Sequence, residues 1–237
     1  QKRMVLAQDV DLPGGDIGSA FDTTLEACER ACLAKPSCEA FTFNTRNGSC
    51  FLKAGPGEAQ PYAGAFSGFV LAGAEGAGER AKLRRSELGF VQDWELGAVT
   101  AQAQGLAREH VTGTWEAGDL VAAAQEAEAQ GDFVGAAWYV GAAINLTDAA
   151  YDWAEYARLL VAAGDVDGPD QQSFRDRAYQ AAVNGYLRAD GAAERHTILV
   201  TMGTALERLG RGGDMVKALR LAQDLQPAKL ASKPFSP

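Results

Sequence analysis

All four cysteines of this 237-residue chain lie between positions 28 and 50, with the spacing C-x3-C-x5-C-x11-C. An even number of cysteines in one short segment is typical of a disulfide framework, and disulfides persist in oxidising compartments. Zinc is the alternative, but its ligand pairs usually stand in tight turns, whereas Cys28 and Cys32 fall on a predicted helix. The cysteines therefore favour a small disulfide-bonded domain in an exported protein.

Residues 1–72 combine strand signals with one helix. The pair Thr23 and Glu26 has the spacing of a capping box, which predicts a helix that runs to about Ala34 and ends before Pro36. Asn47-Gly48 is a strong hairpin signal. Strands are expected at residues 4–6, 40–44, 50–53 and 66–70, with a turn at residues 13–16.

The second part of the chain is rich in alanine and has helical periodicity. A glycine-rich stretch at 73–79 indicates a linker, which we place at 73–83, because its glycine spacing fits no phosphate-binding fingerprint. Beyond it the pattern predicts helices at 84–109, 118–130, 133–145, 148–163, 170–189, 191–209 and 213–225. The short connections predict antiparallel helical hairpins similar to tetratricopeptide repeats.

The predicted fold class is therefore α+β, with two parts. A small disulfide-bonded module at 1–72 precedes an all-α array of antiparallel helical hairpins at 84–227, and a tail follows at 228–237. We expect this tail to lead to further domains downstream.

Charge and hydropathy restrict the partners. The net charge is −9 and both parts are acidic, which argues against nucleic acid as a partner. The one basic run, at residues 80–85, is interpreted as the solvated start of a helix. No apolar stretch approaches the roughly 20 residues that span a bilayer, so no transmembrane segment is predicted.

The sequence predicts no catalytic, cofactor-binding or metal-binding residues. His110 and His196 are the only histidines, and neither belongs to a hydrolase or metalloprotease motif. The loop at 164–170 carries clustered aspartates that could hold calcium, but it lacks the length and the terminal glutamate of an EF-hand. A group of aromatic residues could line a peptide groove, although packing between helices is the favoured interpretation: Trp138, Tyr139, Tyr151, Trp153 and Tyr156.

The stretch from Asp16 to Gly68 resembles the PAN/Apple family. The matching motifs are Pro13-Gly14-Gly15-Asp16, Thr24-Leu25-Glu26-Ala27-Cys28, Ala31-Cys32, Cys38-Glu39-Ala40-Phe41-Thr42-Phe43-Asn44, Cys50-Phe51-Leu52-Lys53 and Ser67-Gly68. The resemblance implies nested disulfides, Cys28–Cys50 and Cys32–Cys38, that tie the helix to the hairpin. It also implies binding of a protein or carbohydrate, without catalytic residues.

The order of the two parts resembles the N-terminal region of bacterial alpha-2-macroglobulin family proteins, which are large periplasmic protease traps. The segment from Glu207 to Pro227 carries that resemblance at the end of the array. It implies a non-catalytic binding and scaffold region of an endopeptidase inhibitor, periplasmic or extracellular, with a lipid anchor as an option in the full-length protein. None of the four cysteines has the Cys-x-Glu-Gln context of a thioester. The alternative is a free-standing secreted adhesion or recognition protein with a PAN domain.

Overall fold

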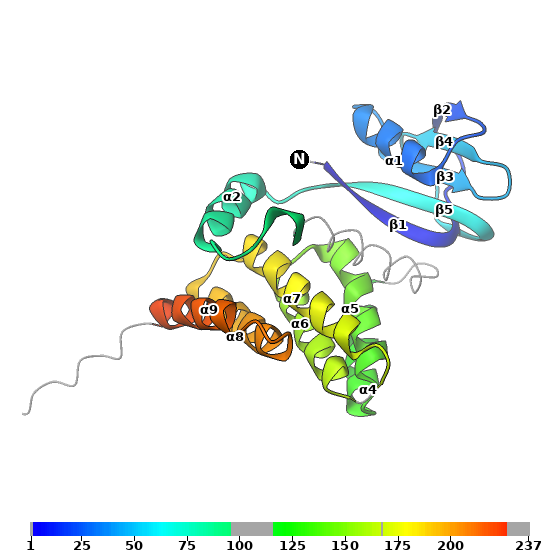
Figure 1. Ribbon diagram of the computed structural model, residues 1–237. Helices are drawn as coiled ribbons and strands as arrows, with labels where there is room; N and C mark the ends of the chain where they lie inside the picture. The colour runs from blue at the N-terminus through cyan, green and yellow to red at the C-terminus, as the bar shows by residue number, and fades with distance from the viewer. Residues whose placement is uncertain (1, 96–115, 167, 227–237) are drawn as a thin grey trace, which may run out of the picture.

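The computed structural model describes residues 2–95, 116–166 and 168–226, which form a small sheet module and a set of helices (Figure 1). The module, residues 2–72, holds five strands and one helix: β1 (Lys2–Asp11), β2 (Asp16–Ala20), α1 (Leu25–Ala34), β3 (Ala40–Asn44), β4 (Ser49–Lys53) and β5 (Gln60–Ala72). The strands form one antiparallel sheet in the order β1-β5-β3-β4-β2. The predicted α+β class, with a small disulfide-bonded sheet before a helical array, is confirmed.

The long pair of β1 and β5 forms one side of the sheet. Its register runs from Lys2 opposite Ala72 to Asp11 opposite Gln60, and it shifts between Gln8 and Val10. Asp9 lies in this irregularity with a φ of 56°, in the left-handed region that short polar residues tolerate best. The predicted strands at 4–6 and 66–70 are therefore the central parts of two much longer strands.

The hairpin of β3 and β4 forms as the sequence predicted. Gly48 has a φ of 64°, a conformation that costs glycine little. The Asn47 side-chain oxygen accepts a hydrogen bond from the Ser49 N–H at 3.1 Å. Strand β2 was not predicted, because residues 16–20 lack the alternation of a half-buried strand and are mostly exposed. Backbone pairing with β4 is what orders them.

Helix α1 begins one residue later than the capping box implied. Thr24 is the N-cap, and its side-chain oxygen accepts from the Ala27 N–H at 3.2 Å. The Thr23 N–H instead donates to the Gly48 carbonyl at 3.0 Å, which holds Thr23 against the hairpin turn. The assignment of Thr23 as the cap was therefore wrong.

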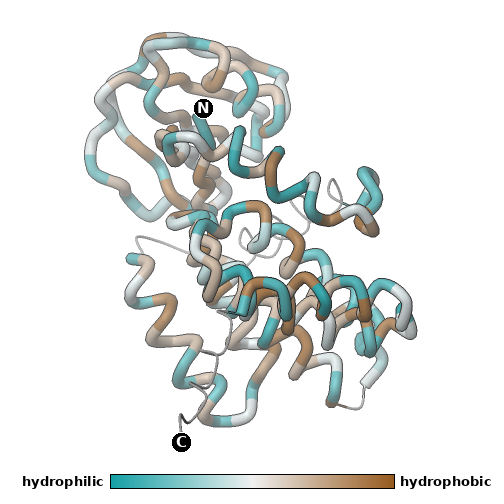
Figure 2. The backbone as a smooth tube through the Cα atoms, turned by 90° about the vertical axis from the view of Figure 1, so that its left-hand side faces the viewer, coloured by the Kyte–Doolittle hydropathy of each residue, from teal (hydrophilic) through white to brown (hydrophobic). Residues whose placement is uncertain are grey.

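The helices are α2 (Ala77–Glu87), α4 (Ala117–Ala129), α5 (Phe133–Thr147), α6 (Ala150–Asp165), α7 (Gln171–Arg188), α8 (Ala192–Arg208) and α9 (Gly212–Leu225). We call α4 to α9 the helical array; their bounds agree closely with the six predicted helices that follow residue 117. Consecutive helices pack on one another, and hydrophobic and hydrophilic stretches alternate along them in Figure 2, as expected for helices with one buried face. No helix in the described ranges is long and apolar enough to span a membrane.

The predicted linker at 73–83 and the predicted helix at 84–109 need correction. Helix α2 begins at Ala77, inside the expected linker, and ends at Glu87. The Arg85 guanidinium then donates to the carbonyls of Leu88 at 2.9 Å and Val91 at 2.6 Å, which stabilises a turn in place of a longer helix. Residues 96–115, which include His110, and the tail after residue 226 lie outside the described ranges.

Small residues let the helices of the array approach closely. A Cβ added at Gly185 on α7 would lie 3.2 Å from the Trp153 Cβ on α6, and one at Gly141 on α5 would lie 3.4 Å from the Tyr156 ring. Trp153 and Tyr156 fill the space between these backbones and are 3% and 2% exposed. The favoured interpretation of both aromatics, packing between helices, is what the structure shows.

Helix α2 packs on α7 through side chains of the basic run. Arg84 is buried, and its Nε donates to the Ala189 carbonyl at 3.0 Å. Arg80 forms an ion pair with Asp190 at 2.5 Å, while Lys82 points to solvent. The basic run is therefore only partly solvated, and two of its arginines attach α2 to the array.

The module contacts the array directly. The Arg3 guanidinium on β1 donates to the backbone carbonyl of Asn145 and, at 2.6 Å, to that of Leu146. Both carbonyls belong to the last turn of α5, where a cation also suits the helix dipole. The two parts are thus joined at the N-terminal end of β1 as well as through α2.

Candidate functional site

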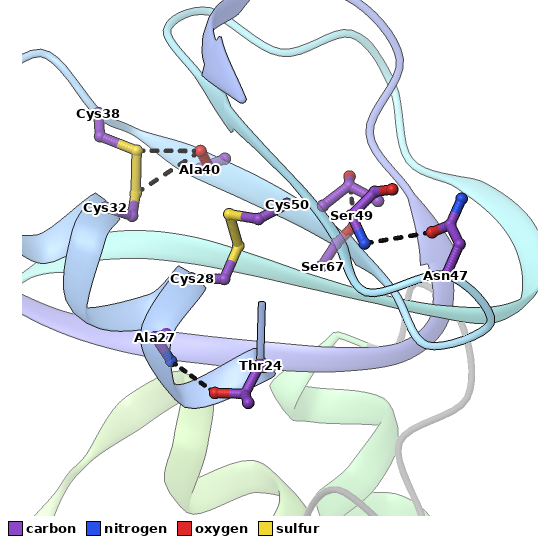
Figure 3. The surroundings of a disulfide bond; sticks show 11 residues. Thr24, Ala27, Cys28, Cys32, Cys38, Ala40, Asn47, Ser49, Cys50 and Ser67 are labelled. Carbon is purple, nitrogen blue, oxygen red and sulfur yellow. Dashed lines mark hydrogen bonds between the residues drawn. A yellow bond between two sulfur atoms is a disulfide. The ribbon is translucent and has the colours of Figure 1, made fainter. Parts of the chain in front are cut away.

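Two disulfides form the centre of the module (Figure 3). Cys28 bonds to Cys50 and Cys32 bonds to Cys38, the same pairs that the family resemblance implies. All four cysteines are at most 1% exposed. Cys28 and Cys32 stand one turn apart on α1, so the first bridge fastens the helix to β4 and the second fastens it to the segment before β3.

The sulfurs of the second bridge lie close to a backbone carbonyl. The Ala40 oxygen is 3.1 Å from the Cys38 Sγ and 3.6 Å from the Cys32 Sγ. A disulfide sulfur carries no hydrogen, so these contacts are polar packing and not hydrogen bonds. Together with Phe41 and Phe43, the cysteines form most of the small core beneath α1.

Two buried hydroxyl groups are hydrogen-bonded to each other on the face of the sheet opposite the disulfide core. The Thr42 and Ser67 hydroxyl oxygens are 2.8 Å apart. The Ser67 hydroxyl donates to the Val10 carbonyl at 2.8 Å, and Thr42 accepts from the Leu12 N–H at 3.1 Å. These bonds hold the end of β1 over the sheet, and Leu12 is fully buried there.

Two phenylalanines form an exposed surface at the β2 side of the sheet. Phe21 is 64% exposed, and its ring meets that of Phe51 edge to face at a centroid distance of 6.1 Å. We call Phe21 and Phe51 the aromatic edge. Figure 1 shows β2 and β4 on the side of the module that faces away from the array.

An ion pair lies near the Phe51 ring of the aromatic edge. Lys53, which is only 4% exposed, contacts Asp16 at 2.6 Å, and its ammonium lies 6.0 Å from the Phe51 ring centre. An aromatic ring that keeps one face in water beside fixed polar groups can stack on a sugar or pack on a protein side chain. The sequence signal for this surface was weak, because Phe21 follows a strand without alternation and pairs with a residue 30 positions away.

The backbone edge of β2 is less suited to pairing with another strand. The sheet order makes β2 an outer strand, and outer strands can pair with added strands. Here the register is irregular between Asp16 and Gly18, and the Lys35 ammonium donates to the Ile17 carbonyl at 2.8 Å. The side chains of the aromatic edge are therefore the better candidate contact surface.

The other residues that the sequence singled out are scattered. His196 lies inside α8, with its Nε2 3.1 Å from the Gln226 Nε2. The Arg208 guanidinium donates hydrogen bonds to the two carboxylate oxygens of Asp165 at 2.7 and 3.2 Å. Residue 167 of the same loop lies outside the described ranges. Across the described residues, His, Cys, Asp and Glu nowhere form a group of three that could hold a metal ion.

A buried carboxylate in the segment after α2 makes structural contacts with the array. Glu95 is 5% exposed; it contacts Arg211 at 2.6 Å and accepts from the Tyr179 hydroxyl at 3.1 Å. The Arg211 guanidinium also lies over the Tyr179 ring, 4.6 Å from its centre. Burial raises the pKa of Tyr179 above its ordinary range. This network attaches the segment after α2 to α7 and to the start of α9.

Comparison with known proteins supports the module alone. Neither the curated proteins nor the solved structures gave a match to the chain. Residues 10–53 match the family model of the PAN domain. That range contains β2, α1, β3 and β4 with both disulfides. The similarity to the PAN domain thus lies within the N-terminal module, residues 2–72, which we call the PAN module.

Proposed function

We propose that this protein is an exported, non-catalytic recognition protein whose PAN module binds a protein or carbohydrate partner. The observation that carries the proposal is the pair of buried disulfides inside the residues that match the PAN domain. Such bonds persist where the surroundings are oxidising. In this proposal the helical array serves as a support for the module.

We place the partner on the aromatic edge. Phe21 offers an exposed ring that Phe51 holds from the side, so little side-chain freedom is lost when a partner covers it. The surface faces away from the array, so a large partner can reach it without meeting the helices.

Binding of the full chain to a glycan array and to candidate surface proteins tests this proposal. Phe21→Ala should weaken the interaction at least tenfold, the usual effect of removing a well-packed aromatic anchor. Tyr151→Ala is the matched control, because Tyr151 is 67% exposed on the array. Equal binding by the two variants would show that the aromatic edge does not bind the partner.

A more specific setting is also proposed: the N-terminal region of a bacterial alpha-2-macroglobulin-like protease inhibitor in the periplasm. Its support is the order of the parts, a single PAN domain before a cysteine-free helical array. The native gene would then continue into β-sandwich macroglobulin domains. A stop codon soon after Pro237 would instead favour a free-standing adhesion protein.

The absence of catalysis is part of the proposal and has its own test. The full chain should show no turnover with peptide, ester or glycoside substrates. Activity that disappears in His196→Ala would show that the protein is an enzyme.

A further inference from the structure

A cleft of about 930 Å³ lies where the PAN module meets the helices. Its walls come from β1 and α1 of the module, from α2, and from the ends of α5 and α7 with the start of α6. Ligand sites commonly have volumes of about 300–1,000 Å³ and form preferentially between domains. The cleft therefore has the size and position of a binding site that neither part could make alone.

The cleft is cationic, although the chain has a net charge of −9. The described residues that line it include four cations, Lys2, Arg3, Arg80 and Arg188, and two carboxylates, Glu29 and Asp148. Arg80 forms an ion pair with Asp190 and Arg188 forms one with Asp148, so the excess positive charge comes from Lys2 and Arg3. Lys2 donates to the Pro36 carbonyl at 3.2 Å, and Arg3 donates to carbonyls of α5. Within the described ranges no carboxylate forms a salt bridge with either of these two side chains, so their charges attract anions.

Several contacts fix the position of Arg188, one of the residues that line the cleft. Its Nε donates to the Asp148 Oδ1 at 2.6 Å, and its Nη1 donates to the Asn184 backbone and side-chain oxygens, each at 3.0 Å. The guanidinium lies over the Trp153 ring, 4.9 Å from its centre. Its Nη2 has no hydrogen bond within the described part of the chain. A cation held in this way loses little conformational entropy when it binds a carboxylate.

The rest of the wall favours a polypeptide over a glycan. Half-buried aliphatic side chains such as Leu33 and Leu187 line the cleft. The only aromatic residue among the described lining residues is Trp153, which is 3% exposed and covered by Arg188. It offers no free ring face on which a sugar could stack.

We propose that this cleft binds a short, extended peptide segment that carries carboxylates between apolar side chains. The carboxylates pair with Lys2, Arg80 and Arg188, and the apolar side chains contact the aliphatic wall. This site is separate from the aromatic edge and needs both the module and the array. The proposal therefore goes beyond the binding role of the PAN module.

Fluorescence polarisation of the full chain with a labelled peptide of alternating glutamate and leucine tests the proposal. The cleft variant is Lys2→Gln with Arg80→Gln. The matched control is Lys82→Gln with Lys217→Gln, which removes the same charge from lysines that are 76% and 60% exposed. We expect saturable binding that weakens about tenfold in the cleft variant, stays unchanged in the control, and falls as salt is raised.

Each other outcome would overturn the proposal. Failure of the unmodified chain to bind the peptide at low salt would show that the cleft does not bind acidic peptides. Equal weakening in both double variants would mean that overall charge, not the cleft, attracts the peptide. Tighter binding of an oligogalacturonate, with the same dependence on Lys2 and Arg80, would assign the cleft to acidic glycans.

Discussion

The PAN module and the helical array are stabilised in different ways. The core beneath α1 is small, and four of its seven buried members are cysteines; hydroxyl groups and a lysine are buried nearby. The array has no cysteine; its core packs many alanines against larger aliphatic side chains and a few aromatics, and glycines allow close contacts between helices. The module therefore relies on covalent bonds and hydrogen bonds, whereas the array relies on close contact between helices.

This difference has a general reason. A domain of about 70 residues has a marginal hydrophobic core, and disulfides add stability by reducing the entropy of its unfolded chain. Helices that meet through small residues gain close backbone contact without such bonds. Each part should therefore fail under conditions that the other survives.

Loss of the disulfides should have the largest effect. The loop-entropy model assigns about 3 kcal/mol to the Cys28–Cys50 bridge and about 2 kcal/mol to the Cys32–Cys38 bridge. Reduction should unfold the module, seen as fast hydrogen exchange in β3 and β4. All four tryptophans lie between positions 94 and 153, so tryptophan fluorescence should stay native. A simultaneous loss of fluorescence would mean that the two parts unfold together.

Two glycine-to-alanine substitutions, one in the module and one in the array, compare how each part tolerates an added methyl group. In Gly68→Ala, the new Cβ would lie 2.3 Å from the Phe41 ring, which is fully buried. We expect a loss of about 2–4 kcal/mol in the free energy of unfolding of the module.

Gly203→Ala is the matched change in the array. Its Cβ would lie 2.8 Å from the Leu219 Cδ2, the end of a side chain that is 39% exposed and free to rotate. Alanine also favours the helix by up to about 1 kcal/mol. The net change should stay below about 1 kcal/mol, as measured by chemical unfolding followed by tryptophan fluorescence. An equal cost at both sites would contradict the expectation that the partly exposed Leu219 side chain moves aside more easily than the buried Phe41 ring.

Alkaline pH should weaken the array before the module. Burial, followed by its hydrogen bond to Glu87, raises the pKa of Tyr186 to about 12, and burial also raises the pKa of Tyr156 and of Tyr179. Unfolded tyrosines ionise near pH 10, so the unfolded array loses protons that the folded array keeps. The array should therefore lose stability as pH rises from about 10 to 12.

Tyr186→Phe isolates one of these groups. The variant should show a shallower loss of array stability above pH 10, measured by unfolding at several pH values with tryptophan fluorescence. The same pH dependence in both proteins would exclude Tyr186 as a contributor.

Arg3→Gln should have the smallest effect on stability and a visible effect on shape. Among the residues that the structure describes, the Arg3 guanidinium donates hydrogen bonds to carbonyls at the end of α5, so each part should keep its stability within about 1 kcal/mol. Small-angle X-ray scattering should show a wider range of module positions. Arg158→Gln, which removes exposed ion pairs within the array, should leave the scattering curve unchanged.

Local features of the fold were predictable from the sequence, and long-range features were not. The Asn47-Gly48 hairpin and the helices after residue 117 follow from turn chemistry and from apolar periodicity. Strand β2 was missed because only pairing with β4 orders it. The start of α2 was missed because its anchor, Arg84, binds a carbonyl about 100 positions away.

The candidate sites, too, could be predicted from the sequence only in part. The cysteine pairs came from the family resemblance, because four cysteines alone allow three connectivities. The aromatic edge and the cleft bring together side chains that carry no shared motif, such as Asp148, Trp153 and Arg188. Sequence order gives no reason to group them, and they become neighbours only when α5, α6 and α7 pack.

The most direct test of the central claim is the mass of the folded protein after alkylation, with and without prior reduction. The account predicts no alkylated cysteine before reduction, four after reduction, and non-reduced peptides that join Cys28 to Cys50 and Cys32 to Cys38. Four thiols alkylated without reduction would contradict the disulfide-bonded module. That result would also remove the main support for an exported recognition protein.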